Sequence, residues 1–285
     1  MTWLVVAGCV VALVAVGALV YWQLIIAEGA YMGPRVVAWT YDWVARRYDA
    51  IKQFDPADED WFISAPLWRR LAGIDRPLLL DVATGTGRVP LALVRNRLAM
   101  PWGQIVGLDL SWEMLRQARA KLRDYGDRVS LVWQDASRLP FDDDTFDAVT
   151  CLEAIEFLPR PREALAEMVR VLAPGGWLMV TNRVGNAARL LPGRVFSRPL
   201  FQQALAALPL HDVETRAWQA DYDLAMTRKV GNGDLAGRGG VSLASLLHCP
   251  VCREHVDQPA GQLVCGGCGQ VFSIRDGIVA LAERE

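Results

Sequence analysis

Residues 78–93, LLLDVATGTGRVPLAL, decide the fold of this 285-residue chain, because an apolar strand runs through Asp81 into a glycine loop that leads into a helix. Gly85 and Gly87 let the backbone approach a ligand more closely than a side chain would allow. Pro90 stands where the dinucleotide pattern GxGxxG has its third glycine, and proline is well tolerated in a first helical turn. The loop therefore predicts a nucleotide site, and it argues against nicotinamide dinucleotides.

Further apolar strands follow, separated by helical segments. They begin the segments 105–115, 129–141 and 146–158, and the last is WLMVT at 177–181. The helical run PREALAEMVRVL, 161–172, ends at the sequence Ala-Pro-Gly-Gly, 173–176, which we interpret as a helix-stopping turn. This alternation of strand and helix predicts an α/β fold with a parallel sheet and a ligand at the carboxyl ends of its strands.

Acidic residues follow two of these strands. Asp109 ends the second strand about twenty residues past the glycines, where a carboxylate can accept both hydroxyls of a ribose. Asp135 and Ala136 come just after the third strand. Taken alone, each acidic residue is also explained as a helix cap or a solvated turn. The glycine loop and both carboxylates at compatible spacings together favour a ligand site.

In this order the blocks resemble the class I S-adenosylmethionine-dependent methyltransferases over residues 41–230, and the family pattern D-x-G-x-G-x-G has alanine at its first glycine. The resemblance implies a Rossmann-like, seven-stranded, mostly parallel sheet that ends in an antiparallel hairpin at 213–230. It places Asp81 near the methionine amino group, Gly85 and Gly87 beside the cofactor, Asp109 at the ribose hydroxyls and Asp135 at the adenine amine. The cofactor-binding residues that it implies are Asp81, Ala83, Thr84, Gly85, Gly87, Asp109, Leu110, Met114, Asp135 and Ala136.

The sequence offers few candidates for a catalytic side chain. Methyl transfer from a sulfonium needs mainly proximity, alignment and removal of water, so no universal catalytic residue exists. Glu153 and Glu156 follow the fourth strand, and Glu156 is a candidate general base if burial raises its pKa. The alternative for each is a helix-start carboxylate favoured by the helix dipole. The Asn-Pro-Pro-Tyr signature of amino-methylating DNA and protein enzymes is absent. Its absence disfavours adenine and glutamine amides as acceptors.

Residues 3–26 contain no charged residue, and as a helix they would extend about 36 Å at 1.5 Å per residue. Trp3 lies at one end and Tyr21 and Trp22 at the other, as in interfacial aromatic belts. A cleaved signal peptide and a buried core helix are the alternatives, but a basic region before the apolar stretch is missing. We expect a single-pass membrane anchor over residues 1–30.

The charges around this segment predict its orientation. No Lys or Arg precedes it, whereas several follow it, so the rest of the chain is expected on the cytoplasmic side. These basic residues are Arg35, Arg46, Arg47 and Lys52. An apolar content of 52% with a mean hydropathy of +0.17 agrees with an anchored enzyme.

Two CxxC pairs lie near the C-terminal end, and twelve residues separate them. Four thiolates at this spacing predict one structural zinc ion with no open position for water. Disulfides are the alternative, but the body of the chain is expected in the reducing cytosol. The predicted ligands are Cys249, Cys252, Cys265 and Cys268. His248 and His255 are not needed as ligands, and we interpret Cys9 and Cys151 as small apolar residues.

The segment that contains these cysteines is similar to the small zinc-ribbon proteins that activate tRNA, rRNA and release-factor methyltransferases. The run Ile274–Arg275–Asp276–Gly277–Ile278 stands intact, while Ser273 and Val279 replace two prolines. The resemblance implies that residues 245–285 cap or stabilise the methyltransferase domain at 31–230. The glycine-rich residues 231–244 between them are expected to be a flexible linker.

Two acceptor classes remain open. Residues 41–54, YDWVARRYDAIKQF, and the glycine loop resemble the ubiquinone and menaquinone C-methyltransferases, which favours a lipid or lipophilic acceptor, and residues 183–210 are basic and apolar enough for an interfacial lid. Arg88 and the run Ala154–Ile155–Glu156–Phe157 depart from that family. The alternative is a tRNA, rRNA or release-factor acceptor. With 30 basic against 32 acidic residues, the chain offers no clustered basic excess for RNA, and no DNA partner is expected.

Overall fold

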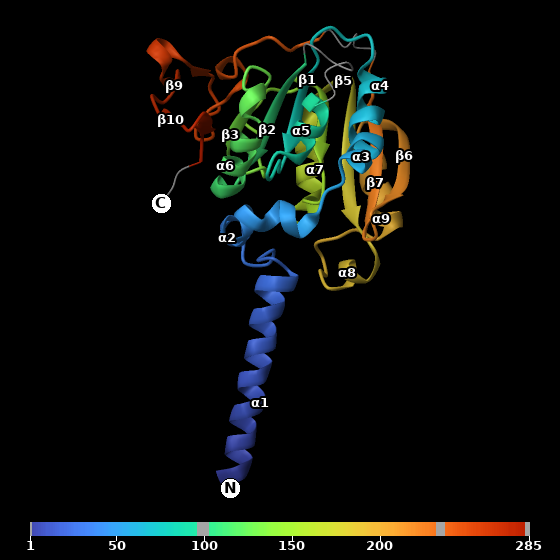
Figure 1. The fold of residues 1–285 in the computed structure, drawn as a ribbon, viewed down its shortest axis with the longest axis vertical. Coiled ribbons are helices and arrows are strands. Elements are labelled where there is room, and N and C mark those ends of the chain that lie inside the picture. The colour runs from blue at the N-terminus through green and yellow to red at the C-terminus, as the bar shows by residue number, and fades with distance from the viewer. Residues whose placement is uncertain (1, 96–102, 232–236, 283–285) are drawn as a thin grey trace.

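The computed structural model describes residues 2–95, 103–231 and 237–282 (Figure 1). An α/β body carries a long helix at its N-terminal end and a small cysteine-containing lobe at its C-terminal end. The strands of the body are β1 (Leu78–Val82), β2 (Gln104–Asp109), β3 (Val129–Trp133), β4 (Phe146–Cys151), β5 (Leu172–Arg183), β6 (Leu210–Trp218) and β7 (Tyr222–Lys229). The lobe contains η5 (Ala244–Leu246), β8 (Val256–Asp257), η6 (Pro259–Gly261), β9 (Leu263–Cys265), β10 (Val271–Arg275) and β11 (Ile278–Ala280).

Helices cover both faces of the sheet in the body. At the N-terminal end lie α1 (Thr2–Tyr21), η1 (Trp22–Ile26), α2 (Pro34–Lys52), α3 (Pro56–Glu59), η2 (Asp60–Ser64) and α4 (Ala65–Leu71). Between and after the strands lie α5 (Arg88–Arg95), α6 (Trp112–Lys121), η3 (Arg123–Tyr125), η4 (Ile155–Phe157), α7 (Pro161–Val171), α8 (Gly185–Arg189) and α9 (Arg198–Ala206). Every residue of β1 and β4 is buried, as expected for central strands of a parallel sheet with helices on both faces.

The strands of the body run in the order β6-β7-β5-β4-β1-β2-β3. β1 to β5 pair in parallel, while β7 is antiparallel to β5 and to β6. The expected α/β fold and the antiparallel hairpin are confirmed, with β6 beginning at Leu210, slightly before the predicted residue 213.

Across the described residues the sheet has eleven strands, so the expectation of seven was wrong. β11 of the lobe pairs in parallel with β3, with Ile278 opposite Leu131 and Ala280 opposite Trp133, and β10, β9 and β8 continue the sheet. β3 would otherwise be an edge strand with unpaired backbone groups, and β11 satisfies them. The resemblance that implied seven strands concerned the body alone and carried no information about how the lobe attaches.

The predicted turn at 173–176 lies inside a strand. α7 ends at Val171, as expected, but β5 already begins at Leu172. The register between β4 and β5 shifts there, because Phe146 is opposite Leu172 and Ala148 is opposite Trp177. A Cβ atom on Gly176 would lie 2.8 Å from the carbonyl oxygen of Ala173, so the bulge requires glycine at this position.

The lobe shares its hydrophobic core with the body. Leu247, Val256 and Phe272 belong to the same buried cluster as Leu139 and Phe141. Backbone hydrogen bonds join the two parts, among them the His248 amide to the Pro140 carbonyl at 2.9 Å and the Leu281 amide to the Trp133 carbonyl at 3.1 Å. The lobe is therefore packed against the body as an extension of its sheet and core.

Of the predicted linker, the structure describes Gly231 and the residues after 236, since residues 232–236 lie outside the described residues. The Gly239 amide donates to the Arg76 carbonyl at 2.7 Å, and Arg238 forms an ion pair with the buried Asp147 at 3.1 Å. This end of the linker is thus attached to the side of the sheet where β1 and β2 begin.

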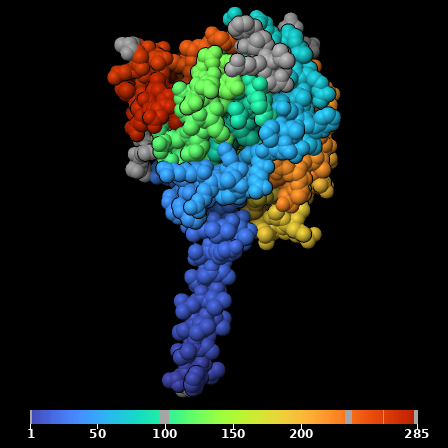
Figure 2. Space-filling view, viewed as in Figure 1, coloured from blue at the N-terminus to red at the C-terminus, as the bar shows by residue number. Residues whose placement is uncertain are grey.

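The helix Thr2–Ile26 extends away from the body (Figures 1 and 2). It is long and apolar enough to cross a membrane, and none of the residues of α1 is buried. The alternative of a core helix therefore lacks support in the described chain. Length and composition alone do not distinguish a membrane span from a signal sequence.

Candidate functional site

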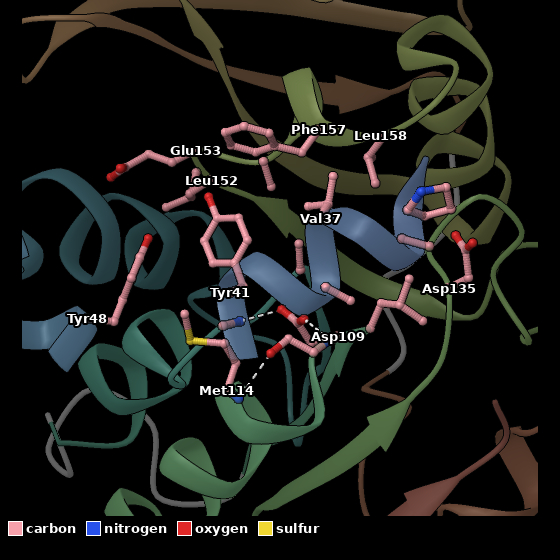
Figure 3. Close-up of a pocket in the computed structure, with 18 residues that line it drawn as sticks. Val37, Tyr41, Tyr48, Asp109, Met114, Asp135, Leu152, Glu153, Phe157 and Leu158 are labelled. Carbon is pink, nitrogen blue, oxygen red and sulfur yellow. Dashed lines mark hydrogen bonds between the residues drawn. The ribbon is translucent and has the colours of Figure 1, made fainter. Parts of the chain in front are cut away.

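A pocket lies at the carboxyl ends of β1 to β4, and α2 forms its opposite wall (Figure 3). The space within it is about 730 Å³, part of which is open to solvent. The residues that line it are Pro34, Val37, Ala38, Tyr41, Tyr48, Ala83, Gly85, Asp109, Leu110, Ser111, Met114, Asp135, Ala136, Leu152, Glu153, Ala154, Phe157 and Leu158. Seven of the predicted cofactor residues are among them, whereas Asp81, Thr84 and Gly87 are not.

Asp109 is held in place in this pocket by backbone amides. It ends β2, and its carboxylate accepts hydrogen bonds from the Gly85 amide at 2.7 Å and the Ser111 amide at 2.8 Å. Burial raises its pKa to about 6, although both amides favour the ionised form. A carboxylate has about four acceptor sites, so Asp109 keeps capacity to accept from a hydroxyl group of a ligand. The geometry suits the predicted contact with a ribose.

The two glycines of the loop lie in different surroundings, so the absence of a side chain matters for a different reason at each. Gly85 has a φ of +53°, and a Cβ built on it would have no heavy atom within 4 Å, so the space beside it is open. A Cβ on Gly87 would lie 2.8 Å from Leu122 Cδ1 and 3.0 Å from the Cβ of Ala118. Gly87 therefore allows α6 to pack closely against the loop, and only Gly85 lines the pocket.

Asp81 lies beneath the loop. Its carboxylate accepts from the hydroxyl of Thr84 at 2.6 Å and from the hydroxyl of Thr150 at 2.6 Å. Burial raises its pKa to about 6, against the opposing effect of the two hydroxyls. In this arrangement Asp81 positions the loop, and its contact with the methionine amino group remains a prediction.

The wall formed by α2 was not predicted as part of the site. Val37, Tyr41 and Tyr48 point from one side of this helix into the pocket (Figure 3). Their spacing of four and seven residues is the signal that a helical periodicity argument would have found.

Two aspartates fasten α2 to the body. Asp42 accepts from the Ser111 hydroxyl at 2.6 Å and the Glu113 amide at 2.9 Å, at the start of α6. Asp49 accepts from the Thr86 hydroxyl at 2.6 Å and pairs with Lys121 at 2.7 Å. The wall of the pocket is therefore held by the same loop and helix that position Asp109.

Glu153 is an acidic residue that lines the pocket beside Leu152, on the side that we call the acceptor side and that also includes Phe157 and Leu158. It pairs with Lys52 at 2.7 Å and with Arg88, whose guanidinium also binds Glu59 through two contacts of 2.7 Å. Burial would raise the pKa of Glu153, but Lys52 and Arg88 outweigh this effect and lower it. Arg88, which departs from the quinone-methyltransferase pattern, is thus an ionic partner that keeps Glu153 charged.

Glu156 does not line the pocket. It is fully buried, accepts from the Tyr222 hydroxyl at 2.9 Å, and lies 3.7 Å from Arg183 Nε. Burial raises its pKa, and Arg183 opposes this in part. The raised pKa was the condition for a general base, but the carboxylate that faces the pocket is Glu153. A catalytic role for Glu156 stays a prediction that its position outside the pocket does not favour.

Residues 183–210, which were expected to form an interfacial lid, do not line the pocket. We call this segment the cover. Phe201 is buried, and Arg198 binds Asp223 through two contacts of 2.6 and 2.9 Å. The cover contacts the segment that follows α1, because Trp22 Nε1 donates to the Leu190 carbonyl at 3.1 Å and the Tyr31 hydroxyl donates to the Pro192 carbonyl at 2.8 Å.

The four cysteines of the lobe come together as predicted, with all their sulfur atoms within 4.8 Å of one another. The Cys249 and Cys268 sulfurs are 3.7 Å apart, close to the edge of about 3.8 Å of a tetrahedron with zinc–sulfur bonds of about 2.3 Å. The Cys252 and Cys265 sulfurs are 3.2 Å apart, and none of the four forms a disulfide. The donor set fits a structural zinc ion.

The histidines beside this cluster have other partners. His248 contacts Asp142 through Nε2 at 2.8 Å and the Arg253 carbonyl through Nδ1 at 2.7 Å, and its ring lies 4.2 Å from that of His255. Together with Asp142 they form a separate group whose possible ligand atoms lie within 4.8 Å of one another. That neither histidine binds the zinc ion stays a prediction.

Comparison with known families identifies two regions of the chain. Residues 80–180 match the family described as "Methyltransferase domain", and residues 242–277 match the family described as "Trm112p-like protein". The first region contains β1 to β4 and the pocket loops, and the second contains the four cysteines.

Among characterised proteins, the chain is 36% identical over 162 residues to the ubiquinone/menaquinone biosynthesis C-methyltransferase UbiE of Syntrophotalea carbinolica, which covers 55% of this chain and 66% of that protein. The chain spans only 58% and 66% of the length of the first two curated relatives that it matches.

Two solved structures show the fold. The cyclase SpnF has a TM-score of 0.57 at 22% identity, covering 70% of this chain and 97% of its own. A chain from a complex that contains the Haloferax volcanii Trm112 methyltransferase activator has a TM-score of 0.51 at 23% identity, covering 67% and 98%. The first of these is named for a cyclisation, so the fold by itself does not specify the reaction.

The chain therefore contains a methyltransferase domain with the class I S-adenosylmethionine-dependent methyltransferase fold, and a Trm112p-like domain extends the sheet of that domain.

Proposed function

We propose that this protein is a membrane-anchored S-adenosylmethionine-dependent methyltransferase that acts on a lipid or another lipophilic acceptor. One observation carries the proposal: the helix that forms a wall of the pocket directly follows the apolar helix. Only residues 27–33 separate the end of η1 at Ile26 from the start of α2 at Pro34. Part of the site is thus built by the segment that leaves the proposed membrane span.

We expect the pocket to hold the ribose and the adenine of the cofactor, while the contact of Asp81 with the methionine amino group stays a prediction. Asp109 would accept the ribose hydroxyls, Asp135 would meet the adenine amine, and Gly85 leaves room beside the loop. Ala83, Leu110, Met114 and Ala136 supply further surface. The cofactor, when bound, supplies a methyl group on a positively charged sulfur.

The residues of the chain would then orient the acceptor and exclude water. Leu152, Phe157 and Leu158 give the acceptor side of the pocket an apolar surface, while the charge of Glu153 is fixed by its two cations. An acceptor held there in line with the methyl group gains from proximity and from the loss of water.

Anchoring follows from α1 and from the charges beyond it. At 1.5 Å per residue, the 20 residues of α1 match a hydrocarbon core of about 30 Å. Trp3, Tyr21 and Trp22 lie near its ends, and the basic residues follow it. We infer a single span with the methyltransferase domain on the cytoplasmic side.

The relative named for ubiquinone and menaquinone biosynthesis supports a lipophilic acceptor. The match covers only part of that protein, and Arg88 and the run Ala154–Phe157 differ from the quinone family. The proposal therefore extends to the lipophilic class and does not name a quinone.

The first test is methyl transfer from radiolabelled S-adenosylmethionine into a native membrane extract that is separated into lipid, RNA and protein fractions. We expect label in the organic-soluble lipid. The variant Asp109→Ala should bind the cofactor 10- to 100-fold more weakly, about 1.4 to 2.7 kcal/mol, by titration calorimetry. Unchanged affinity would refute the cofactor assignment, whereas label confined to RNA or protein would refute only the acceptor.

A second candidate is a methyltransferase of the translation apparatus with a built-in activator. The Trm112p-like match favours it, since this family resembles activators of tRNA, rRNA and release-factor enzymes. The balance of 30 basic and 32 acidic residues argues against an RNA surface. The same extract experiment decides between the two, because this candidate requires label in RNA or protein.

A further inference from the structure

A second hollow, which we call the membrane-side groove, lies between the end of the apolar helix and α2. Leu24 and Ile25 of η1 line one side, and Trp39, Trp43, Val44 and Ile51 of α2 line the other. Its space is about 1180 Å³, part of which is open to solvent. The groove is therefore an apolar space of substantial size outside the cofactor pocket.

The groove adjoins the pocket through shared residues. Tyr41 and Tyr48 line both hollows, and Figure 3 shows the two side chains on the side of the pocket where Leu152 and Glu153 lie. The ring of Tyr41 lies 5.8 Å from that of Phe157, edge to face. Tyr41 and Tyr48 therefore form a shared boundary between the groove and the part of the pocket near Phe157.

The groove also lies at the level where a membrane surface would be. α1 accounts for the hydrocarbon core with its 20 residues, so η1 lies at the polar boundary, and the groove begins there. Trp39 is 60% exposed and Trp43 is 77% exposed, as expected for aromatic residues in an interfacial layer.

Several polar side chains of the groove already have partners within the chain. The Thr40 hydroxyl donates to the Val37 carbonyl at 2.7 Å, Glu28 accepts from the Tyr41 hydroxyl, and Lys52 is bound to Glu153 at 2.7 Å. A peptide segment in the groove would leave its backbone groups without hydrogen-bond partners, which is costly. A hydrocarbon chain needs no such partners, so it is the chemistry that fits.

We propose that the membrane-side groove binds the hydrocarbon chain of the acceptor, which passes from the bilayer along α2 and brings its reactive head group to the pocket beside Tyr41 and Tyr48, the two residues that line both hollows. This inference rests on the proposed function, and it adds the path by which the acceptor would move from the bilayer to the pocket. It assigns to η1 and α2 a role in substrate access that is separate from anchoring.

The test uses the full chain in phosphatidylethanolamine and phosphatidylglycerol vesicles that contain geranylgeraniol carrying a photoreactive diazirine. After illumination, mass spectrometry of the digested protein should find the probe on peptides of η1 and of the groove side of α2. Val44→Trp fills the groove from α2, and Leu24→Trp fills it from η1. Each should reduce this labelling by about tenfold, which corresponds to about 1.4 kcal/mol.

Ala50→Trp is the matched control, because Ala50 is exposed on α2 and lines neither hollow. It should leave labelling unchanged. Cofactor binding and melting temperature, measured for all three variants, identify any that fails to fold, and the two groove variants act from opposite walls. Equal labelling of the groove in a folded Val44→Trp or Leu24→Trp variant would overturn the proposal.

Methyl transfer into the lipid fraction separates this inference from the proposed function. If the wild type methylates lipid and both folded groove variants do so equally well, the groove is not the route, although the function stands. If the wild type methylates no lipid, the proposed function fails and the inference fails with it. Loss of lipid methylation in the groove variants, with Ala50→Trp active, supports both.

Discussion

The Trm112p-like lobe and α1 are both additions to the same α/β body, and both are rich in apolar residues, yet their surroundings differ. Leu247 and Ile278 of the lobe are fully buried in the shared cores. Leu13 of α1 is 73% exposed, and no residue of that helix is buried. The apolar residues of the two additions therefore have different environments. Those of the lobe pack against the body, while α1 presents an exposed surface that suits a lipid environment.

The two additions also act on different parts of the body. The lobe extends the sheet at β3, the strand that precedes Asp135, while the segment after α1 leads into the wall of the pocket. We expect the lobe to determine how stable the body is and the helix to determine where it resides. The following experiments test this division.

Deletion of residues 2–21 should give the largest change. We expect the protein to move completely from the membrane fraction to the soluble fraction in a sedimentation assay, because α1 is the one described helix long and apolar enough to span a bilayer. Melting temperature and cofactor affinity should stay close to those of the full chain, since α1 buries no residue. A variant that aggregates in detergent, or that remains in membranes, would contradict the division.

Removal of zinc should have the opposite result, with loss of stability and no loss of membrane association. Cys249→Ser or a chelator should unfold the lobe and expose the shared core, at a cost of roughly 4 kcal/mol. At about 2–4 °C per kcal/mol, the melting temperature should fall by about 10 °C in calorimetry. Cys9→Ser is the control, because Cys9 is exposed in α1. An unchanged melting temperature without metal would show that the lobe does not stabilise the body.

A pair of single truncations sharpens the comparison at the level of side chains. Ile278→Ala removes a fully buried side chain beside Leu131, and it should lower the free energy of unfolding by about 2–4 kcal/mol. Leu13→Ala should change it by less than about 0.5 kcal/mol in detergent, because its side chain is exposed. Urea denaturation measures both. Equal effects would mean that α1 packs on protein as the lobe does.

Replacement of the buried carboxylate Asp81 should give the smallest change in the free energy of unfolding. Neither the lobe nor α1 should alter its pH dependence. Burial raises the pKa of Asp81 from 3.8 to about 6, so the stability that its protonated form provides is lost as pH rises toward and through 6. Asp81→Asn does not titrate. Its free energy of unfolding relative to the wild type should rise by about 1.4 kcal/mol between pH 5 and pH 8, since about one pKa unit lies in that interval.

This difference should be the same in the full chain and in the variant without residues 2–21, when both are measured by urea denaturation without cofactor. If the difference between Asp81→Asn and the wild type does not depend on pH, Asp81 is already ionised at pH 5 in the folded protein. A dependence on the deletion would show that α1 influences the interior of the body.

Local patterns were sufficient for the predictions that depend on neighbouring residues. The strand, loop and helix around Gly85, the position of Asp109 at a strand end and the two CxxC pairs are each set within a few residues of sequence. The structure places Asp109 against the loop and brings the four sulfurs together, as these patterns predicted.

The predictions that were incomplete concern residues whose surroundings come from distant segments. Glu153 and Glu156 are three residues apart and look alike in sequence, but Lys52 and Arg88 surround the first, while Tyr222 and Arg183 surround the second. The sequence suggests that Gly87 lies beside the ligand, but in the structure it lies against Leu122, which leaves no room for a Cβ atom.

The sequence by itself determined the α/β class, the glycine loop, the cysteine ligand set and the presence of an uncharged helix, because these depend on residue chemistry and short spacings. Only the tertiary structure decided that β11 joins β3, that α2 forms a wall of the pocket, and that a groove connects this wall to the apolar helix. Such features arise when segments far apart in the chain satisfy each other's backbone groups and apolar surfaces, and spacing along the sequence carries no record of that choice.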